Sequence, residues 1–139
     1  MTEKVKIAID AMGGENSPKK IIDALNISLK RNNDMFFYLF GNENTLKKEL
    51  SKNKNLHNHC EIINTKDVIL DDESPLGAAK RSKDSSMWKA IESLKEKKAD
   101  ISLSAGNTGA LLVISRLLLS TIEGISKPAL AALWPNQNN

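Results

Sequence analysis

Cysteine, histidine and aromatic residues are scarce in this sequence, and each scarcity excludes a class of protein. The chain of 139 residues has one cysteine, Cys60, so no internal disulfide can form, which is typical of a reducing compartment. Its two histidines, His57 and His59, lie in a polar segment without further metal ligands at a matching spacing. Aromatic residues make up 4% of the chain and are not interleaved with basic ones, as they are in many nucleic-acid-binding surfaces. We expect neither a metal site nor a nucleic acid partner.

A long hydrophobic run is missing too. The longest, residues 110–119, contains Arg116 and is shorter than the roughly 20 apolar residues that cross a bilayer. The first residues lead straight into a strand-like segment, without the apolar stretch and small-residue cleavage site of a secretory signal. These absences predict a cytoplasmic protein.

Arginine is rare as well, with 3 residues against 17 lysines, and the formal net charge is only +3. Lysine and glutamate are interspersed, as in residues 47–49 and 95–98, which is typical of solvated helix faces. Apolar residues at 40% and charged residues at 27% are ordinary for a soluble globular protein. A chain of this length buries roughly 68–70% of its unfolded surface, so we expect one domain with a hydrophobic core.

Short apolar strands alternate with amphipathic helices along the chain. Strands are expected at residues 5–10, 35–40, 61–64 and 99–103, with a fifth candidate at 128–133. Helices are expected to begin at Ser17-Pro18, at Asn44, at Ser85 and at Ala110, and residues 67–83 are expected to form a loop with a short helical piece. This alternation predicts βαβ units with right-handed crossovers, and so a three-layer α/β sandwich around a mostly parallel sheet.

Several helix boundaries carry specific expectations. Ser17 is expected to cap the first helix, with Pro18 at its first position, and Asn44 is expected to cap the second. The helix that begins near Ser85 is expected to run to Lys97. Residues 110–119 are apolar around nearly the whole circumference of a helix, so that helix is expected to be buried or covered by another domain or subunit.

The segment from Ser104 to Ala110 joins a predicted strand to this apolar helix. Its small residues allow the backbone to approach a ligand, and the N–H groups in the first turn of the helix have no partner within the helix. Phosphate is the natural occupant of such a corner. A tight corner whose glycines only allow the strand and the helix to pack closely fits these seven residues equally well.

A second loop of small residues, from Asp10 to Asn16, follows the first predicted strand. It has no P-loop signature, and Gly13-Gly14 lacks the spacing of a dinucleotide fingerprint. The carboxylate of Asp10 has two interpretations, because it can orient a ligand or form hydrogen bonds within its own turn. Ligands of parallel sheets bind beyond the carboxyl ends of the strands, so we expect both loops to meet at one site.

A basic cluster of Lys80, Arg81 and Lys83 precedes the helix start at Asp84-Ser85-Ser86. Cations, hydroxyls and free helical N–H groups together suit an anionic ligand. A solvated basic turn followed by an ordinary helix cap accounts for the same residues. No G-x-S-x-G segment occurs, and Cys60 has no obvious histidine and acid constellation, so nucleophilic catalysis by the protein has little support.

Four ordered segments give the chain a resemblance to a known family. They are residues 7–14 (IAIDAMGG), 83–87 (KDSSM), 104–110 (SAGNTGA) and 128–132 (PALAA). In this order they resemble the bacterial phosphate acyltransferase family of the PlsX type. The resemblance implies an enzyme of phospholipid synthesis that converts fatty acyl-(acyl carrier protein) and inorganic phosphate to acyl phosphate without a cofactor. It also implies a fold similar to that of phosphotransacetylases and isopropylmalate dehydrogenases, a homodimer and peripheral association with the membrane.

The chain departs from the family pattern in two ways. Glu15 stands where the family usually has aspartate, which keeps the charge and lengthens the side chain. Family members are also well over twice as long, so residues 1–139 are expected to be the N-terminal α/β portion. The other wall of the cleft, most dimer contacts and the membrane-associating helix would then lie in the remaining part.

The resemblance, together with the anion-binding chemistry of the loops, implies a set of site residues. The candidate catalytic residues are Asp10, Lys83, Ser104 and Asn107. The candidate phosphate- or substrate-binding residues are Gly13, Gly14, Lys80, Arg81, Ser85, Ser86, Gly106, Thr108 and Gly109. Phosphate is itself an oxygen nucleophile and a thioester has a good leaving group, so positioning and electrostatics suffice for the reaction.

Two other functions stay open at this point. One is a catalytically incompetent fragment that keeps contacts with the carrier protein or with another subunit. The other is a nucleotide-dependent dehydrogenase of similar fold, although the missing dinucleotide fingerprint counts against it.

Overall fold

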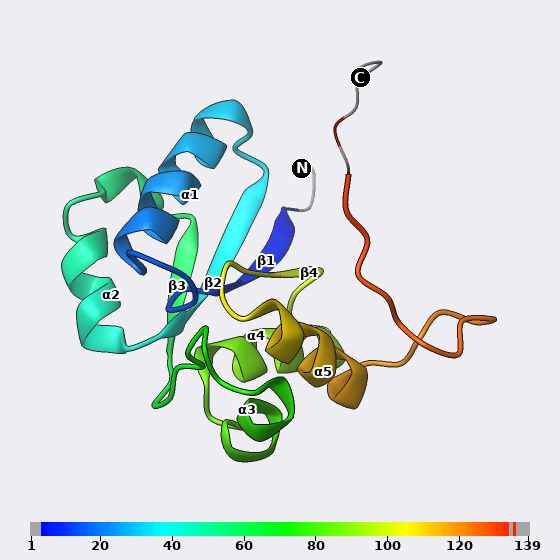
Figure 1. Cartoon of the computed structure of the whole chain (residues 1–139). Helices are drawn as coiled ribbons and strands as arrows, with labels where there is room; N and C mark the ends of the chain where they lie inside the picture. The colour runs from blue at the N-terminus through cyan, green and yellow to red at the C-terminus, as the bar shows by residue number, and fades with distance from the viewer. Residues whose placement is uncertain (1–3, 134, 136–139) are drawn as a thin grey trace.

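Four parallel strands form a single sheet in the computed structural model, which describes residues 4–133 and residue 135 (Figure 1). The strands are β1 (Val5–Asp10), β2 (Met35–Gly41), β3 (Cys60–Asn64) and β4 (Ile101–Ser104). The helices are α1 (Lys19–Arg31), α2 (Glu43–Leu50), α3 (Pro75–Arg81), α4 (Ser86–Lys95) and α5 (Thr108–Leu118), with a short 3-10 helix, η1 (Lys54–Leu56). The strand order is β3-β2-β1-β4, so β1 and β2 lie in the middle.

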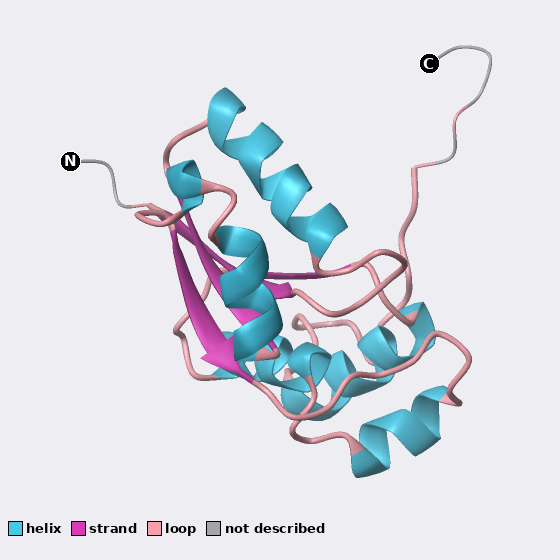
Figure 2. Cartoon of the chain, turned by 90° about the vertical axis from the view of Figure 1, so that its left-hand side faces the viewer, coloured by secondary structure: helices cyan, strands magenta, loops and turns pink. Residues whose placement is uncertain are grey.

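The helices lie on both sides of the strands, which confirms the predicted three-layer α/β architecture (Figure 2). On one face, Ile22 and Leu25 of α1 pack on Ile9 and Leu39 of the sheet. They do so because apolar residues recur along α1 at three- and four-residue spacing, which forms one stripe on the helix. Each such side chain contributes roughly 1.5–3 kcal/mol when it leaves water.

The opposite face is covered by α4, with α3 and α5 outside it. Ala90 of α4 packs near Ala8 and Phe40 of the sheet, and the small alanines let the helix approach closely. A separate apolar cluster joins α3, α4 and α5, with Met87 and Ile114 at its centre. The start of α4 and the start of α5 are therefore held by the same cluster.

The predicted start of α4 is confirmed, whereas the caps predicted for the first two helices are not observed. The helix start expected at Asp84-Ser85-Ser86 is confirmed, and its cap is Ser85, whose Oγ accepts the Trp88 N–H at 3.2 Å. The cap of α2 is Asn42, two residues before the expected Asn44, and its Oδ1 accepts the Thr45 N–H at 3.0 Å. Ser17 caps nothing, because its hydroxyl turns back and donates to the Gly13 carbonyl at 2.5 Å.

The expected bounds of three elements also shift. Helix α1 begins at Lys19, after Pro18 in the N-cap position. Helix α4 ends at Lys95 instead of Lys97, because Lys97 has a φ of +57°, which turns the backbone out of the helix. Strand β4 likewise begins at Ile101, two residues after the expected start.

The expectation of a fifth strand at residues 128–133 is wrong for this chain. This segment has no sheet partner in the described structure and continues an irregular, largely exposed stretch that leads away from the helices (Figure 1). Its apolar residues suit a strand, but a strand forms only where a neighbour supplies the hydrogen bonds.

The apolar helix α5 is covered on one side only. Ala110 and Ile114 are buried against α3 and α4, whereas Leu117 is 61% exposed. The edge strand β4 likewise exposes Ile101 and Leu103. Full burial of α5 is thus not observed, and cover by another domain or subunit stays a prediction. None of the helices in the described part of the chain has the length and apolar character that a membrane crossing needs.

Candidate functional site

Two neighbouring strands, β1 and β4, end side by side with polar residues. Asp10 and Ser104 are the last residues of these strands and are register partners in the sheet. The chain leaves β1 toward α1 on one face and leaves β4 toward α5 on the side of α4. Ligands of open parallel sheets bind at such a switch point, where successive connections diverge to opposite faces.

The Asp10 carboxylate is buried and fully engaged by the protein. Its Oδ2 accepts a hydrogen bond of 2.7 Å from the Ser104 hydroxyl, and its Oδ1 accepts the N–H groups of Gly13 at 3.1 Å and Met12 at 3.3 Å. The Ser104 Oγ in turn accepts the Gly106 N–H at 3.1 Å. Of the two interpretations of Asp10, the structure shows the one in which it orders its own turn and, in addition, ties that turn to β4.

The two glycine loops meet, as the sequence predicts. A Cβ added to Gly13 would lie 3.0 Å from the Gly106 nitrogen, so a side chain there would push the loops apart. Gly14 has a φ of +84°, and a Cβ on it would lie 2.6 Å from the Ala105 carbonyl oxygen. Close packing therefore explains these glycines without a ligand, and it also brings the Asp10 and Ser104 loops together.

Helix α5 begins at this junction with an asparagine cap. The Oδ1 of Asn107 accepts the Ala110 N–H at 3.0 Å, and Asn107 itself is 8% exposed. The N–H groups of Thr108 and Gly109, in the first turn, have no partner within the helix. Gly109 lies tightly against Pro75, because a Cβ added to it would lie 2.5 Å from the Pro75 Cγ. The beginnings of α3 and α5 are thus packed directly on each other.

The start of α4 supports this corner from the core. A Cβ added to Gly106 would lie 3.4 Å from the Met87 Cε, so Met87 packs beneath the loop. Ser85 and Ser86 are 0% and 1% exposed. The Ser85 hydroxyl caps the helix, and the Ser86 Oγ is buried without a hydrogen-bond partner in the part of the chain that the structure describes. These two predicted phosphate contacts therefore face the protein interior in this arrangement.

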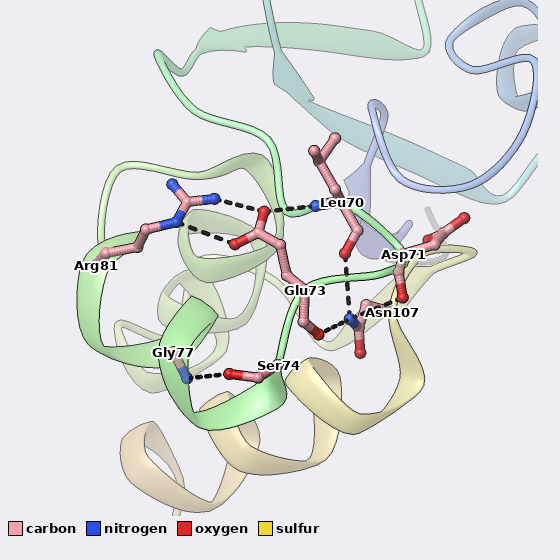
Figure 3. A network of polar contacts seen from close by, with 7 residues as sticks. All are labelled: Leu70, Asp71, Glu73, Ser74, Gly77, Arg81 and Asn107. Atoms are coloured by element: carbon pink, nitrogen blue, oxygen red, sulfur yellow. Dashed lines mark hydrogen bonds and ion pairs between the residues drawn. The ribbon is translucent and has the colours of Figure 1, made fainter.

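The basic cluster divides into one engaged and two exposed cations. The Arg81 guanidinium binds the Glu73 carboxylate through two hydrogen bonds, from Nε to Oε2 at 3.0 Å and from Nη2 to Oε1 at 2.5 Å (Figure 3). These hydrogen bonds lower the pKa of Glu73 and raise the pKa of Arg81. Lys80 and Lys83 are exposed. Arg81 already has an anionic partner, whereas both lysines face solvent.

Asn107 also attaches the loop before α3 to this corner, a contact that was not predicted from the sequence. The Asn107 Nδ2 donates to the backbone carbonyls of Leu70 at 3.2 Å, Asp71 at 3.3 Å and Glu73 at 2.9 Å (Figure 3). Carbonyl acceptors are common to all residue types, so no pattern identifies them. Only the acid in Glu73, followed by a helix start and by Arg81, offered a local signal for an ordered loop.

An open apolar pocket of about 230 Å³ borders the junction on the α1 face. Ile9 and Leu103 of the sheet and Leu25 of α1 form its apolar walls, and Ser104 lies at its polar end. The polar carboxyl ends of β1 and β4 thus adjoin an apolar surface.

Cys60, His57 and His59 lie away from the two glycine loops, and their contacts are with the surrounding protein. Burial raises the pKa of Cys60 to about 11, so its thiol stays protonated near neutral pH. His57 and His59 each lie within hydrogen-bonding distance of a backbone carbonyl, at 3.1 and 3.2 Å. Within residues 4–133 and residue 135, no three His, Cys, Asp or Glu side chains gather as a metal site requires.

Comparison with known proteins places the chain in a family. The model of the fatty acid synthesis protein family matches residues 5–139. A phosphate acyltransferase of Pelagibacter ubique is 55% identical over 139 residues, which are the whole of this chain and 41% of that protein. Phosphate acyltransferases of Rhodopseudomonas palustris (strain TIE-1) and Roseobacter denitrificans are 41% and 36% identical, each over 97% of this chain and 38% of their own length.

The chain therefore spans about two fifths of the length of these curated relatives. The family match extends over all four strands and both glycine loops, and the resemblance found in the sequence is confirmed at this level. This chain belongs to the fatty acid synthesis protein family, whose curated relatives here are phosphate acyltransferases.

Proposed function

We propose that this chain forms the phosphate-handling part of a phosphate acyltransferase, which transfers a fatty acyl group from acyl-(acyl carrier protein) to inorganic phosphate for phospholipid synthesis. One observation carries the proposal. The first turn of α5, with the N–H groups of Thr108 and Gly109 free of helical partners, lies at the switch point where β1 and β4 end. The names of the relatives support the reaction class.

In the proposed reaction, a phosphate oxygen attacks the thioester carbonyl carbon. The new carbon–oxygen bond forms as the carbon–sulfur bond breaks, and the carrier protein leaves as a thiolate that then takes up a proton. The protein contributes no covalent intermediate. Its work is to hold phosphate against the carbonyl and to stabilise negative charge, and each well-placed donor contributes about 2.7–4 kcal/mol to such stabilisation.

The contacts of the predicted residues support a division of roles among them. Direct contact with phosphate falls to the backbone N–H groups of Thr108 and Gly109. The Gly106 N–H already donates to the Ser104 Oγ, so Gly106 shapes the loop instead. Exposed Lys80 and Lys83 offset charge or meet the acidic carrier protein. Asp10 and Ser104 hold the two loops in place, because their polar atoms are already engaged with each other and with backbone N–H groups. Gly13, Gly14, Ser85 and Ser86 shape or support the corner.

The same proposal includes a homodimer that associates peripherally with the membrane. It is supported by the exposed apolar residues of α5 and β4, among them Leu117 and Leu103, which need cover in an assembled protein. The remaining wall of the cleft would come from the part of the relatives' length that this chain does not match.

The test compares this chain with a hybrid in which it replaces the matching segment of the Pelagibacter ubique relative. The hybrid is expected to form acyl phosphate from acyl-(acyl carrier protein) and inorganic phosphate. A folded hybrid without this activity, beside an active unmodified relative, would contradict the proposal. Activity in the hybrid but not in the isolated chain would show that the chain contributes half of a site. Saturable stabilisation by NAD and not by phosphate would favour a dehydrogenase.

A further inference from the structure

The side-chain amide of Asn107 is committed at both of its ends. Its oxygen caps α5, and its nitrogen donates to three backbone carbonyls of the loop formed by residues 70–73, which we call the acidic loop (Figure 3). An amide nitrogen has two hydrogens, so these two donors are shared among three acceptors. No N–H of this side chain is left to bind a substrate, although the sequence suggested a catalytic role.

The acidic loop has a second attachment on its other side. Glu73 accepts the Leu70 N–H at 2.9 Å through its side chain, and the same carboxylate binds Arg81 at the end of α3. The Glu73 N–H also donates to the Leu70 carbonyl at 3.3 Å, which closes a turn. The turn is thus held by its own contacts, and Asn107, the residue that caps α5, joins it to the start of that helix.

We propose that Asn107 is a positioning residue that fixes the acidic loop beside the phosphate site proposed at the start of α5. The inference rests on the proposed function for its kinetic consequence, but not for its structural one. When the link is lost, the loop is no longer fixed relative to Thr108 and Gly109, and the exposed carboxylates of Asp71 and Asp72 become free to approach the start of α5. They repel a phosphate anion there, while the reacting atoms keep their contacts, so the KM for phosphate rises and kcat does not fall.

Replacement of Asn107 by serine separates the two functions of its side chain, which are to cap α5 and to attach the acidic loop. The Asn107→Ser variant keeps a good helix cap but is too short to cap α5 and reach the acidic loop together. A second variant, Asn107→Asp, keeps the shape and the cap and replaces the donor with a carboxylate oxygen, which three carbonyls repel. The matched control is Asn42→Ser, because the Asn42 side chain caps α2 and, within the described part of the chain, bonds only to the Thr45 N–H and hydroxyl.

Amide hydrogen exchange in this chain, without any ligand, measures whether loss of the Asn107 contacts releases the acidic loop. In Asn107→Ser and Asn107→Asp, the amides of Leu70 and Glu73 are expected to exchange about tenfold faster, the factor that one or two lost hydrogen bonds produce. In Asn42→Ser their exchange is expected to match that of the parent chain. Equal exchange in the parent chain and in both Asn107 variants would overturn the inference.

Steady-state kinetics of the hybrid enzyme measure whether release of the acidic loop weakens phosphate binding. Asn107→Ser is expected to raise the KM for inorganic phosphate about tenfold with kcat within about twofold, whereas Asn42→Ser changes neither. A fall in kcat with an unchanged KM would overturn the positioning role and return Asn107 to the reacting atoms. An inactive parent hybrid would instead contradict the proposed function, and the exchange result would then decide the structural inference by itself.

Discussion

Ser104 donates a 2.7 Å hydrogen bond to Asp10, although 94 positions separate the two residues in the chain. The bond joins the ends of two neighbouring parallel strands, and each partner also holds its own loop, through the N–H groups of Gly13 and Gly106. A buried carboxylate that accepts three hydrogen bonds is well satisfied, and removal of one donor leaves part of its hydrogen-bonding capacity unmet. This pair therefore sets the distance between the two glycine loops.

Replacement of Ser104 by alanine is expected to lower the free energy of unfolding by about 1–3 kcal/mol, because Asp10 loses a buried donor and the Gly106 N–H loses its acceptor. Urea denaturation measures the change. Ser28→Ala is the matched control, since the Ser28 hydroxyl donates to the Ala24 carbonyl of its own helix through an exposed hydrogen bond, and its effect is expected to stay within about 0.5 kcal/mol. Equal losses in both variants would contradict the special role of the pair.

Alanine at Gly14 is expected to destabilise the protein more than alanine at Gly124. Both glycines have a φ of +84°, so both substitutions bear the backbone strain of a left-handed residue, about 1–2 kcal/mol. Only at Gly14 does the new Cβ also meet the Ala105 carbonyl, whereas at Gly124 no described atom lies within 4 Å. The difference between the two unfolding free energies thus isolates the contact between the loops, and a difference of zero would show that the loops adjust freely.

Proline at position 108 is expected to weaken phosphate binding without breaking α5. Thr108 is the first residue of the helix, where proline is tolerated, and Asn107 before it has the extended ψ of 107° that proline favours. The substitution removes one free N–H, and loss of a hydrogen bond to a charged group raises the KM for phosphate about tenfold or more. Helix content is followed by circular dichroism.

Thr108→Ala is the companion variant, because it removes the side chain and keeps the N–H. Its effect on the phosphate KM is expected to be smaller than that of Thr108→Pro. Equal effects would place the phosphate contact on the hydroxyl, and no effect of proline would contradict the cradle at the start of α5.

Acid is expected to weaken the acidic loop through Glu73. Its pKa lies below 4.5 in the folded protein, because Arg81 and the Leu70 N–H bind the charged form, and the unfolded value is near 4.5. The pair therefore stabilises the fold fully above pH 4.5, and this contribution is lost as the pH falls through the lower folded value. Urea midpoints between pH 3 and 7 are expected to fall less steeply in Glu73→Gln than in the parent chain.

The partner substitution checks the cause. If the ion pair is responsible, Arg81→Gln flattens the same part of the pH profile, and the double variant adds little to either single change. Fully additive effects would mean that Glu73 and Arg81 stabilise the loop independently.

Local sequence patterns predicted most of the helices and strands. They did not predict side-chain contacts between residues far apart in the chain. The Ser85 cap follows from a hydroxyl directly before an apolar helical stripe, whereas the choice between Asn42 and Asn44 depends on where β2 ends. Both glycine loops were expected to meet, because parallel strands share one carboxyl edge. The attachment of Asn107 to the acidic loop joins residues 34 to 37 positions apart through backbone carbonyls, which carry no residue signature.

At residues 128–133, by contrast, the sequence predicted a strand that the structure does not contain. Their composition suits a strand, but composition does not specify a neighbour, and without one in the described structure the segment stays irregular. Composition is equally limited for α5, because its apolar outer side predicts that another domain or subunit covers it but does not identify which.

The strand order has a consequence for how the site is made. Strand β4 pairs with β1, although the chain from α1 to α4 lies between them in the sequence. Closing a loop of this length costs conformational entropy before any contact repays it, so the pairing is expected to be a late and slow event in folding. During synthesis, the nascent chain would thus hold β1, β2 and β3 together before it has any place for phosphate, and the site would appear in one step when β4 docks.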